Sequence, residues 1–164
     1  PTLINKSSYV GSIDGVLNAV IIEGQPVGKS TIQGEGAGPA ATTSALVSDI
    51  SSILRGNVKF PFSISDKERK KLRFESISQR YFSAYIRFEV LDKQGILSNI
   101  TKVFSQNKVS IKRLIQNPNK SKGTSSIVII SHKSKDNSLR KIIKIINKKN
   151  YMIKSSKLIR IDDN

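Results

Sequence analysis

The second half of the chain carries strand-like and helix-like hydrophobic patterns in a fixed order, and this order limits the folds open to it. Every even position from Phe82 to Val90 is apolar, which predicts a strand with one buried face. Leu139, Ile142 and Ile146 recur at helical spacing and predict an amphipathic helix. Further patterns predict a helix from Ile96 to about Asn107 and strands over Val109–Gln116, Ser125–His132 and 151–161. This β-α-β-β-α-β order predicts a ferredoxin-like α+β domain over residues 81–164.

Two polar breaks separate these elements. Asp92–Gly95 ends the first strand, and Asn117–Gly123 is expected to be a loop. The Ser125–His132 run has a near-continuous apolar centre, which predicts a strand with apolar side chains on both faces. One face of a four-stranded sheet backed by two helices then lacks a cover, so we expect self-association.

The run DKQGILSNITKVFSQNKVSIKRLIQ (Asp92–Gln116) resembles the first half of an ACT domain. That family's signature is D-K-P-G-V-L, a helix, then N-x-(I/V)-S-I and a terminal glutamine, and Gln94 stands here where proline is usual. The resemblance implies a regulatory domain with an amino-acid effector. It also implies an effector site, in which backbone N–H groups receive the carboxylate of the amino acid and side chains bind its other polar groups. The residues of this site are Asp92, Gly95, Ile96, Leu97, Asn99 and Gln116. Asp92 or Asn99 would bind the ammonium group, and Gln116 a side-chain hydroxyl. The alternative is that Asp92 and Gly95 only cap and turn the chain.

In the first half, three alternate glycines in Gly34–Gly38 run into a helix-favouring segment. Glycines allow positive φ and close backbone approach, and Pro39 suits the first helical position. Free N–H groups at such a helix start attract phosphate or carboxylate. The run is not the dinucleotide fingerprint, which needs a further glycine where Pro39 stands. A predicted hairpin, with strands over Ser12–Glu23 and Val27–Gln33, precedes the turn.

This first half resembles the end of the catalytic region of homoserine dehydrogenases. The shared pattern is a G-V-x-N-A-V strand at Gly15–Val20, G-x-G-A-G at Gly34–Gly38, a small-residue helix start and a V-x-D at Val47–Asp49. The resemblance implies that Gly38 contacts the nicotinamide cofactor, with Gly36 and Ala37 beside it. The alternative is that the three residues only shape the turn.

The two resemblances predict three regions: a catalytic-region tail at 1–56, a linker at 57–80 and an ACT domain at 81–164. A hairpin with one helix cannot bury its own apolar faces, so we expect its partner upstream or in another chain. The chain also begins at Pro1, without methionine and in mid-pattern, which indicates a piece of a longer protein.

Composition narrows the function classes. Residues 1–56 hold 3 Lys/Arg and 4 Asp/Glu; subtraction from the totals of 28 and 12 leaves 25 and 8 for residues 57–164. The charge is scattered and accompanied by no aromatic stacking platform, so we expect no nucleic-acid partner. No cysteine is present, and the single histidine, His132, excludes a histidine-based metal cluster, so no metal is expected. Without an apolar run of roughly 18 residues we expect no membrane association and a cytoplasmic protein.

The sequence thus predicts the C-terminal part of a homoserine dehydrogenase, an oxidoreductase that interconverts aspartate semialdehyde and homoserine in threonine, methionine and isoleucine biosynthesis. The resemblance implies NAD(P) as cofactor of the full-length enzyme, allosteric feedback by threonine, and a homo-oligomer, expected to be a dimer. These 164 residues alone are expected to bind no cofactor and to be inactive, because the nucleotide-binding domain and the catalytic lysine of the family lie upstream. The alternatives are a stand-alone amino-acid-sensing ACT protein and a basic nucleic-acid-binding protein.

Overall fold

The computed structural model describes residues 1–56, 65, 67–68 and 76–162. The chain divides into a larger unit, Pro1–Asn5 with Phe74–Asn164, and a smaller unit, Lys6–Arg73. Most of the predicted linker at 57–80 lies outside the described residues, and the predicted boundaries at 56 and 80 stay predictions. Within the described ranges, no helix has the length and apolar character needed to cross a membrane.

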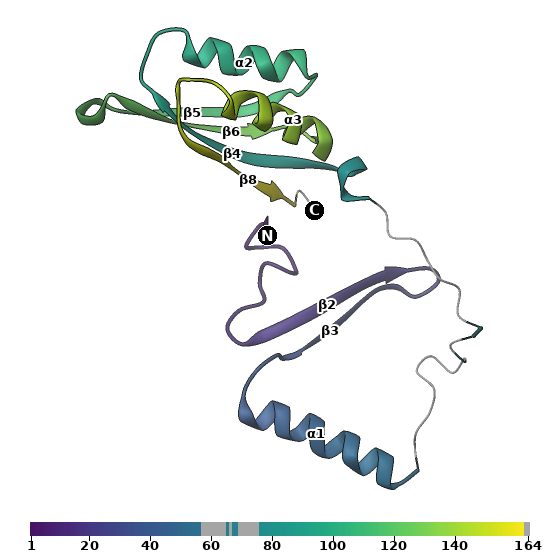
Figure 1. Ribbon diagram of the computed structural model, residues 1–164. Helices are drawn as coiled ribbons and strands as arrows, with labels where there is room; N and C mark the ends of the chain where they lie inside the picture. The colour runs from purple at the N-terminus through teal and green to yellow at the C-terminus, as the bar shows by residue number, and fades with distance from the viewer. Residues whose placement is uncertain (57–64, 66, 69–75, 163–164) are drawn as a thin grey trace. The chain divides into compact units, whose positions relative to one another are not determined.

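The larger unit is a twisted sheet with both of its helices on one face (Figure 1). Its main elements are β4 (Tyr81–Leu91), α2 (Ile96–Gln106), β5 (Ile111–Asn119), β6 (Thr124–Ser131), α3 (Asp136–Asn147) and β8 (Met152–Ile161). Short elements add β1 (Thr2–Leu3), η2 (Ile77–Gln79), η3 (Lys120–Lys122) and β7 (Ser134–Lys135). The antiparallel order β8-β4-β6-β5 confirms the predicted ferredoxin-like α+β fold, and β1 extends the sheet parallel to β8.

Alternation along the strands builds the core of the larger unit. The side chains of Ala84, Ile86 and Phe88 on β4 are fully buried and face the helices. Helical spacing places the matching residues of α2 and α3 above them: Ile96, Ile100, Val103, Phe104, Leu139, Ile142 and Ile146. The Phe88 and Phe104 rings meet edge to face at 6.4 Å between centroids. Each fully buried large side chain stabilises the fold by about 1.5–3 kcal/mol.

Two boundaries differ from the sequence prediction. The predicted loop from Asn117 is in fact the end of β5, where Pro118 pairs with Ser125. Proline is tolerated there because β5 is an edge strand, and only one of its sides needs backbone donors. In the smaller unit, the first strand begins at Leu17 rather than Ser12, because the residues before it form turns such as Ser12 N–H to Ser8 O.

The smaller unit consists of an antiparallel hairpin, β2 (Leu17–Gly24) with β3 (Gly28–Glu35), and the helix α1 (Pro39–Leu54). Hairpin and helix agree with the sequence prediction, and α1 begins at the expected proline. No side chain of residues 6–56 is buried. The apolar stripe of α1 is 55–64% exposed at Ile50, Leu46 and Ile53. These elements therefore leave their apolar faces open, as the sequence argument required.

Candidate functional site

The start of α2 is open to an anion. Gly95 precedes the helix with φ +82°, a left-handed conformation that favours glycine, and no side chain caps the first turn. The Asn99 N–H donates to Gly95 O at 2.9 Å, whereas no hydrogen bond from the Leu97 N–H is found within the described residues. A Cβ placed on Gly95 would meet no atom within 4 Å. The helix dipole and the Leu97 N–H therefore favour a carboxylate at this end.

The predicted effector residues of this loop divide by burial. Asp92, Gly95 and Asn99 are exposed, whereas the Ile96 side chain is 7% exposed and belongs to the core. Leu97 packs partly against the same core. Ile96 and Leu97 can thus offer a ligand only their backbone N–H groups, and the Ile96 N–H already donates to Lys93 O at 3.5 Å. The Asp92 N–H donates to Gly123 O at 2.9 Å and fixes the loop to the β5–β6 connection.

Gln116 lies apart from this loop along the chain but on the same side of the sheet as α2. It pairs with Ile127, which pairs in turn with Phe88, and both partners are buried under the helices. Gln116 itself is exposed because β5 is the sheet edge. The register therefore places Gln116 on the helix side, and no described contact joins it to the Asp92–Gly95 loop.

A polar cavity of about 430 Å³ lies beside α2. Its lining residues come from α2 and from the turn before β8: Asn99, Lys102, Val103, Gln106, Lys149, Asn150 and Tyr151. Tyr151 is only 9% exposed, and its buried hydroxyl has no hydrogen-bond partner in this part of the structure. Burial raises the pKa of the Tyr151 hydroxyl above its usual 10.0. The sequence predicted Tyr151 at the start of a strand but did not predict this cavity. The one sign of it in the sequence was a tyrosine hydroxyl at a position otherwise expected to be apolar.

In the glycine turn of the smaller unit, the local structure explains why two of the positions are occupied by glycine. A Cβ on Gly36 would lie 1.2 Å from Asn18 Nδ2, so the Asn18 side chain occupies that space. Gly38 has φ +119° ahead of Pro39, and its carbonyl accepts from Thr42 Oγ1 at 2.8 Å. Ala37 lies exposed between the two glycines. Exposed N–H groups at the uncapped start of α1 fit a cofactor contact as well as a turn.

Comparison with known proteins relates both halves of this chain to known families. Residues 1–51 match the family model for homoserine dehydrogenase, and residues 84–150 match the model for the ACT domain. The homoserine dehydrogenase of Neisseria gonorrhoeae is 31% identical over 99% of this chain and 39% of its own length. That of Helicobacter pylori is 26% identical over 99% of this chain and 38% of its own length. The chain is therefore similar to part of the homoserine dehydrogenases, with an ACT-domain match in its second half.

A solved structure shows a similar fold. The crystal structure of a homoserine dehydrogenase from Thiobacillus denitrificans has a TM-score of 0.79 at 24% identity, covering 99% of this chain and 38% of that one. The chain thus spans less than two fifths of the length of these relatives, and residues 84–150 of its larger unit match the ACT-domain model.

Proposed function

We propose that this chain is the regulatory end of an NAD(P)-dependent enzyme that interconverts aspartate semialdehyde and homoserine. The observation that carries the proposal is the end-to-end match: 99% of the chain aligns with proteins named homoserine dehydrogenase, through the glycine turn and the ACT domain in one order. The nicotinamide cofactor would supply or accept the hydride. Gly36, Ala37 and Gly38 would contact it through backbone groups. The biosynthetic role and a cytoplasmic location belong to the same proposal.

The test is an assay of the whole protein to which this chain belongs. We expect homoserine-dependent reduction of NAD⁺ or NADP⁺, followed by absorbance at the nicotinamide band. The matched control is the same protein with its ACT region deleted, which should retain turnover while losing any amino-acid response. Absence of turnover with both cofactors, in a folded whole protein, would reject the enzymatic proposal and leave the stand-alone amino-acid sensor as the better reading.

For the larger unit we propose a threonine site at the start of α2. The open, uncapped helix end supports a carboxylate site, since an exposed helix end contributes about 0.3–1 kcal/mol. That is too weak for sensing, so Asp92 or Asn99 must bind the ammonium group, adding about 1.5–3 kcal/mol for a charged contact, and Gln116 must bind the hydroxyl, adding about 0.5–1.5 kcal/mol for a neutral one. Gln116 lies on an edge strand, so a second copy of the chain beside β5 would complete the site. We accordingly propose a homo-oligomer, a dimer at the least, which light scattering of the chain will check.

A Gly95→Asn variant tests this site without breaking the turn. Asparagine tolerates left-handed φ, and the space in front of Gly95 is empty, so the fold should persist while the new side chain blocks the approach to the N–H groups. We expect calorimetry to give heat with threonine and little with alanine or isoleucine, and at least about tenfold weaker threonine binding in the variant. Lys93→Gln, in the same loop, is the control. Unchanged binding in folded Gly95→Asn would place the effector elsewhere.

A further inference from the structure

A groove runs between α3 and β8 in the larger unit. Its charged end lies near the start of β4, whereas the Asp92–Gly95 loop follows the end of that strand. It has a volume of about 390 Å³. Two short rows of side chains line it, Arg140, Ile143 and Lys144 from α3 and Ser156, Leu158 and Arg160 from β8, and Pro1 lies beside them. Helical spacing on one wall and strand alternation on the other therefore bring six residues from separate segments together.

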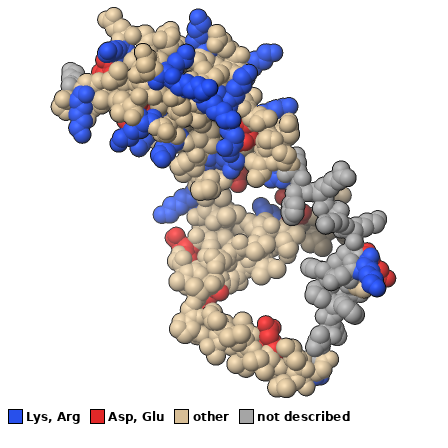
Figure 2. All heavy atoms as spheres, in the orientation of Figure 1, with Lys and Arg blue, Asp and Glu red and all other residues tan. Residues whose placement is uncertain are grey.

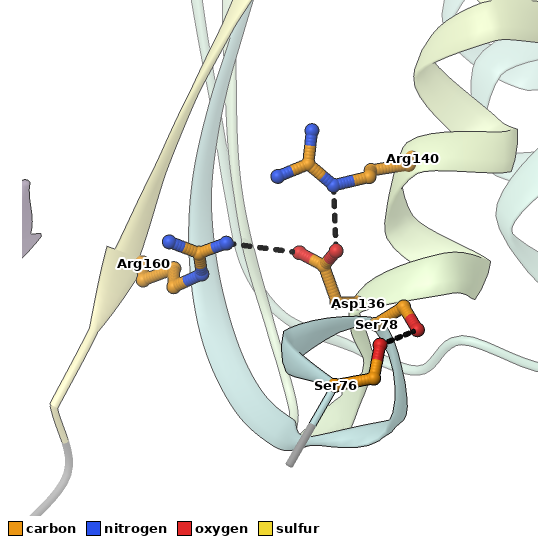
Figure 3. Close-up of polar contacts among 5 residues, drawn as sticks. All are labelled: Ser76, Ser78, Asp136, Arg140 and Arg160. Atoms are coloured by element: carbon orange, nitrogen blue, oxygen red, sulfur yellow. Dashed lines mark hydrogen bonds and ion pairs between the residues drawn. The ribbon is translucent and has the colours of Figure 1, made fainter. Parts of the chain in front are cut away.

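Positive charge exceeds negative charge in this groove. Asp136, which is 2% exposed, accepts hydrogen bonds from Arg140 Nε at 2.5 Å and from Arg160 Nη2 at 3.4 Å (Figure 3). Lys144 has no ion-pair partner in the described part of the chain. One carboxylate thus faces three cations. Figure 2 shows the wider setting, with Lys and Arg side chains spread over the larger unit.

Two donors in the groove lack acceptors. Arg160 Nε and Ser156 Oγ are both buried, and neither has a hydrogen-bond partner among the described residues. They lie on the same face of β8, since their positions differ by four, and Leu158 stands between them. Asp136 and the Phe82 ring, 5.0 Å below the guanidinium, hold Arg160 in place. Buried donors normally find partners, so these two polar atoms leave unmet hydrogen bonds beside the groove.

We propose that this groove binds a small organic oxyanion, a carboxylate or a phosphate ester. The planar guanidinium groups of Arg140 and Arg160 match the geometry of such groups, and Lys144 adds a point charge. Ile143 and Leu158 provide an apolar middle for the ligand's hydrocarbon part. An ammonium group gains little here, because Asp136 already serves two arginines. The site thus differs in chemistry and place from the amino-acid site proposed at α2, and it does not depend on that proposal.

The test is isothermal titration calorimetry on the 164-residue chain with succinate, inorganic phosphate and the neutral analogue succinamide. Lys144→Gln removes a groove cation that is exposed and makes no contact with Asp136, so the fold is kept. Lys157→Gln is the matched control, because Lys157 on β8 pairs with the exposed Arg87 on β4 and points to the other face of the sheet. Each variant lowers the net charge from +16 to +15, so any non-specific attraction falls equally in both.

We expect at least one of the two anions to bind, with at least about tenfold weaker binding in Lys144→Gln and less than about twofold change in Lys157→Gln. Tighter succinate than phosphate would identify a carboxylate ligand, and the reverse a phosphorylated one; either result supports the site. Three results would overturn it: no binding of either anion up to about 10 mM, equal heat with succinamide, or equal loss in the two variants.

Discussion

At the scale of single residues, the larger unit contains one buried hydroxyl whose protonation should affect stability. Tyr151 is 9% exposed, its hydroxyl has no partner among the described residues, and burial raises its pKa above 10.0. The folded protein therefore keeps a proton that the unfolded chain loses above pH 10.0. The free energy of unfolding is unaffected by this group below that pH and falls as the pH rises through it.

We expect Tyr151→Phe to raise the free energy of unfolding by about 1 kcal/mol at neutral pH, because the variant removes an unsatisfied buried polar atom. Above pH 10.0 the variant should lose stability less steeply than the parent. Urea titrations at pH 7 and at several values above 10 measure both effects. Tyr81→Phe is the control, since Tyr81 is 63% exposed and should change neither. A destabilised Tyr151→Phe at pH 7 would show instead that the hydroxyl makes a stabilising interaction.

At the scale of elements, the sequence predicted those helices and strands whose stabilising pattern lies within the segment itself. The strand β4 and the helices α2 and α3 were predicted because each carries its own periodic apolar face. The end of β5 was missed because Pro118 reads as a breaker, and only its position at the sheet edge makes it acceptable. The strand β1 was also missed: two residues cannot signal a strand, and its partner Arg160 is distant in sequence from Thr2.

The candidate sites follow the same rule. The Asp92–Gly95 loop was predicted because all of its residues are consecutive and resemble a known signature. The groove between α3 and β8 was not, because its cations look like scattered, solvated charges until the fold brings Lys144 and Arg160 to facing walls. Asp136 gave no signal either, although it joins α3 to β8 and its N–H donates to Arg80 O next to η2.

At the scale of the whole molecule, the two units should differ sharply in stability. The larger unit has a contiguous core on both helices and the sheet. The smaller unit buries no side chain over residues 6–56, and an isolated hairpin and a 16-residue helix are each marginal in water. Large apolar side chains on its strands, among them Val20 at 59% and Ile32 at 64%, are exposed. Its stability must therefore come from packing against surfaces beyond its own described residues.

Hydrogen exchange on the 164-residue chain measures this difference. We expect amides of β2, β3 and α1 to exchange with protection of less than about 2 kcal/mol, since local openings expose little buried surface. Amides of β4, β6 and α3 should be protected up to the free energy of global unfolding, typically about 5–15 kcal/mol. In the longer protein, the same hairpin and helix amides should gain protection while those of β4 stay nearly unchanged, which makes β4 the internal control. Equal protection of β2 and β4 in the short chain would contradict the view that the smaller unit depends on an outside partner.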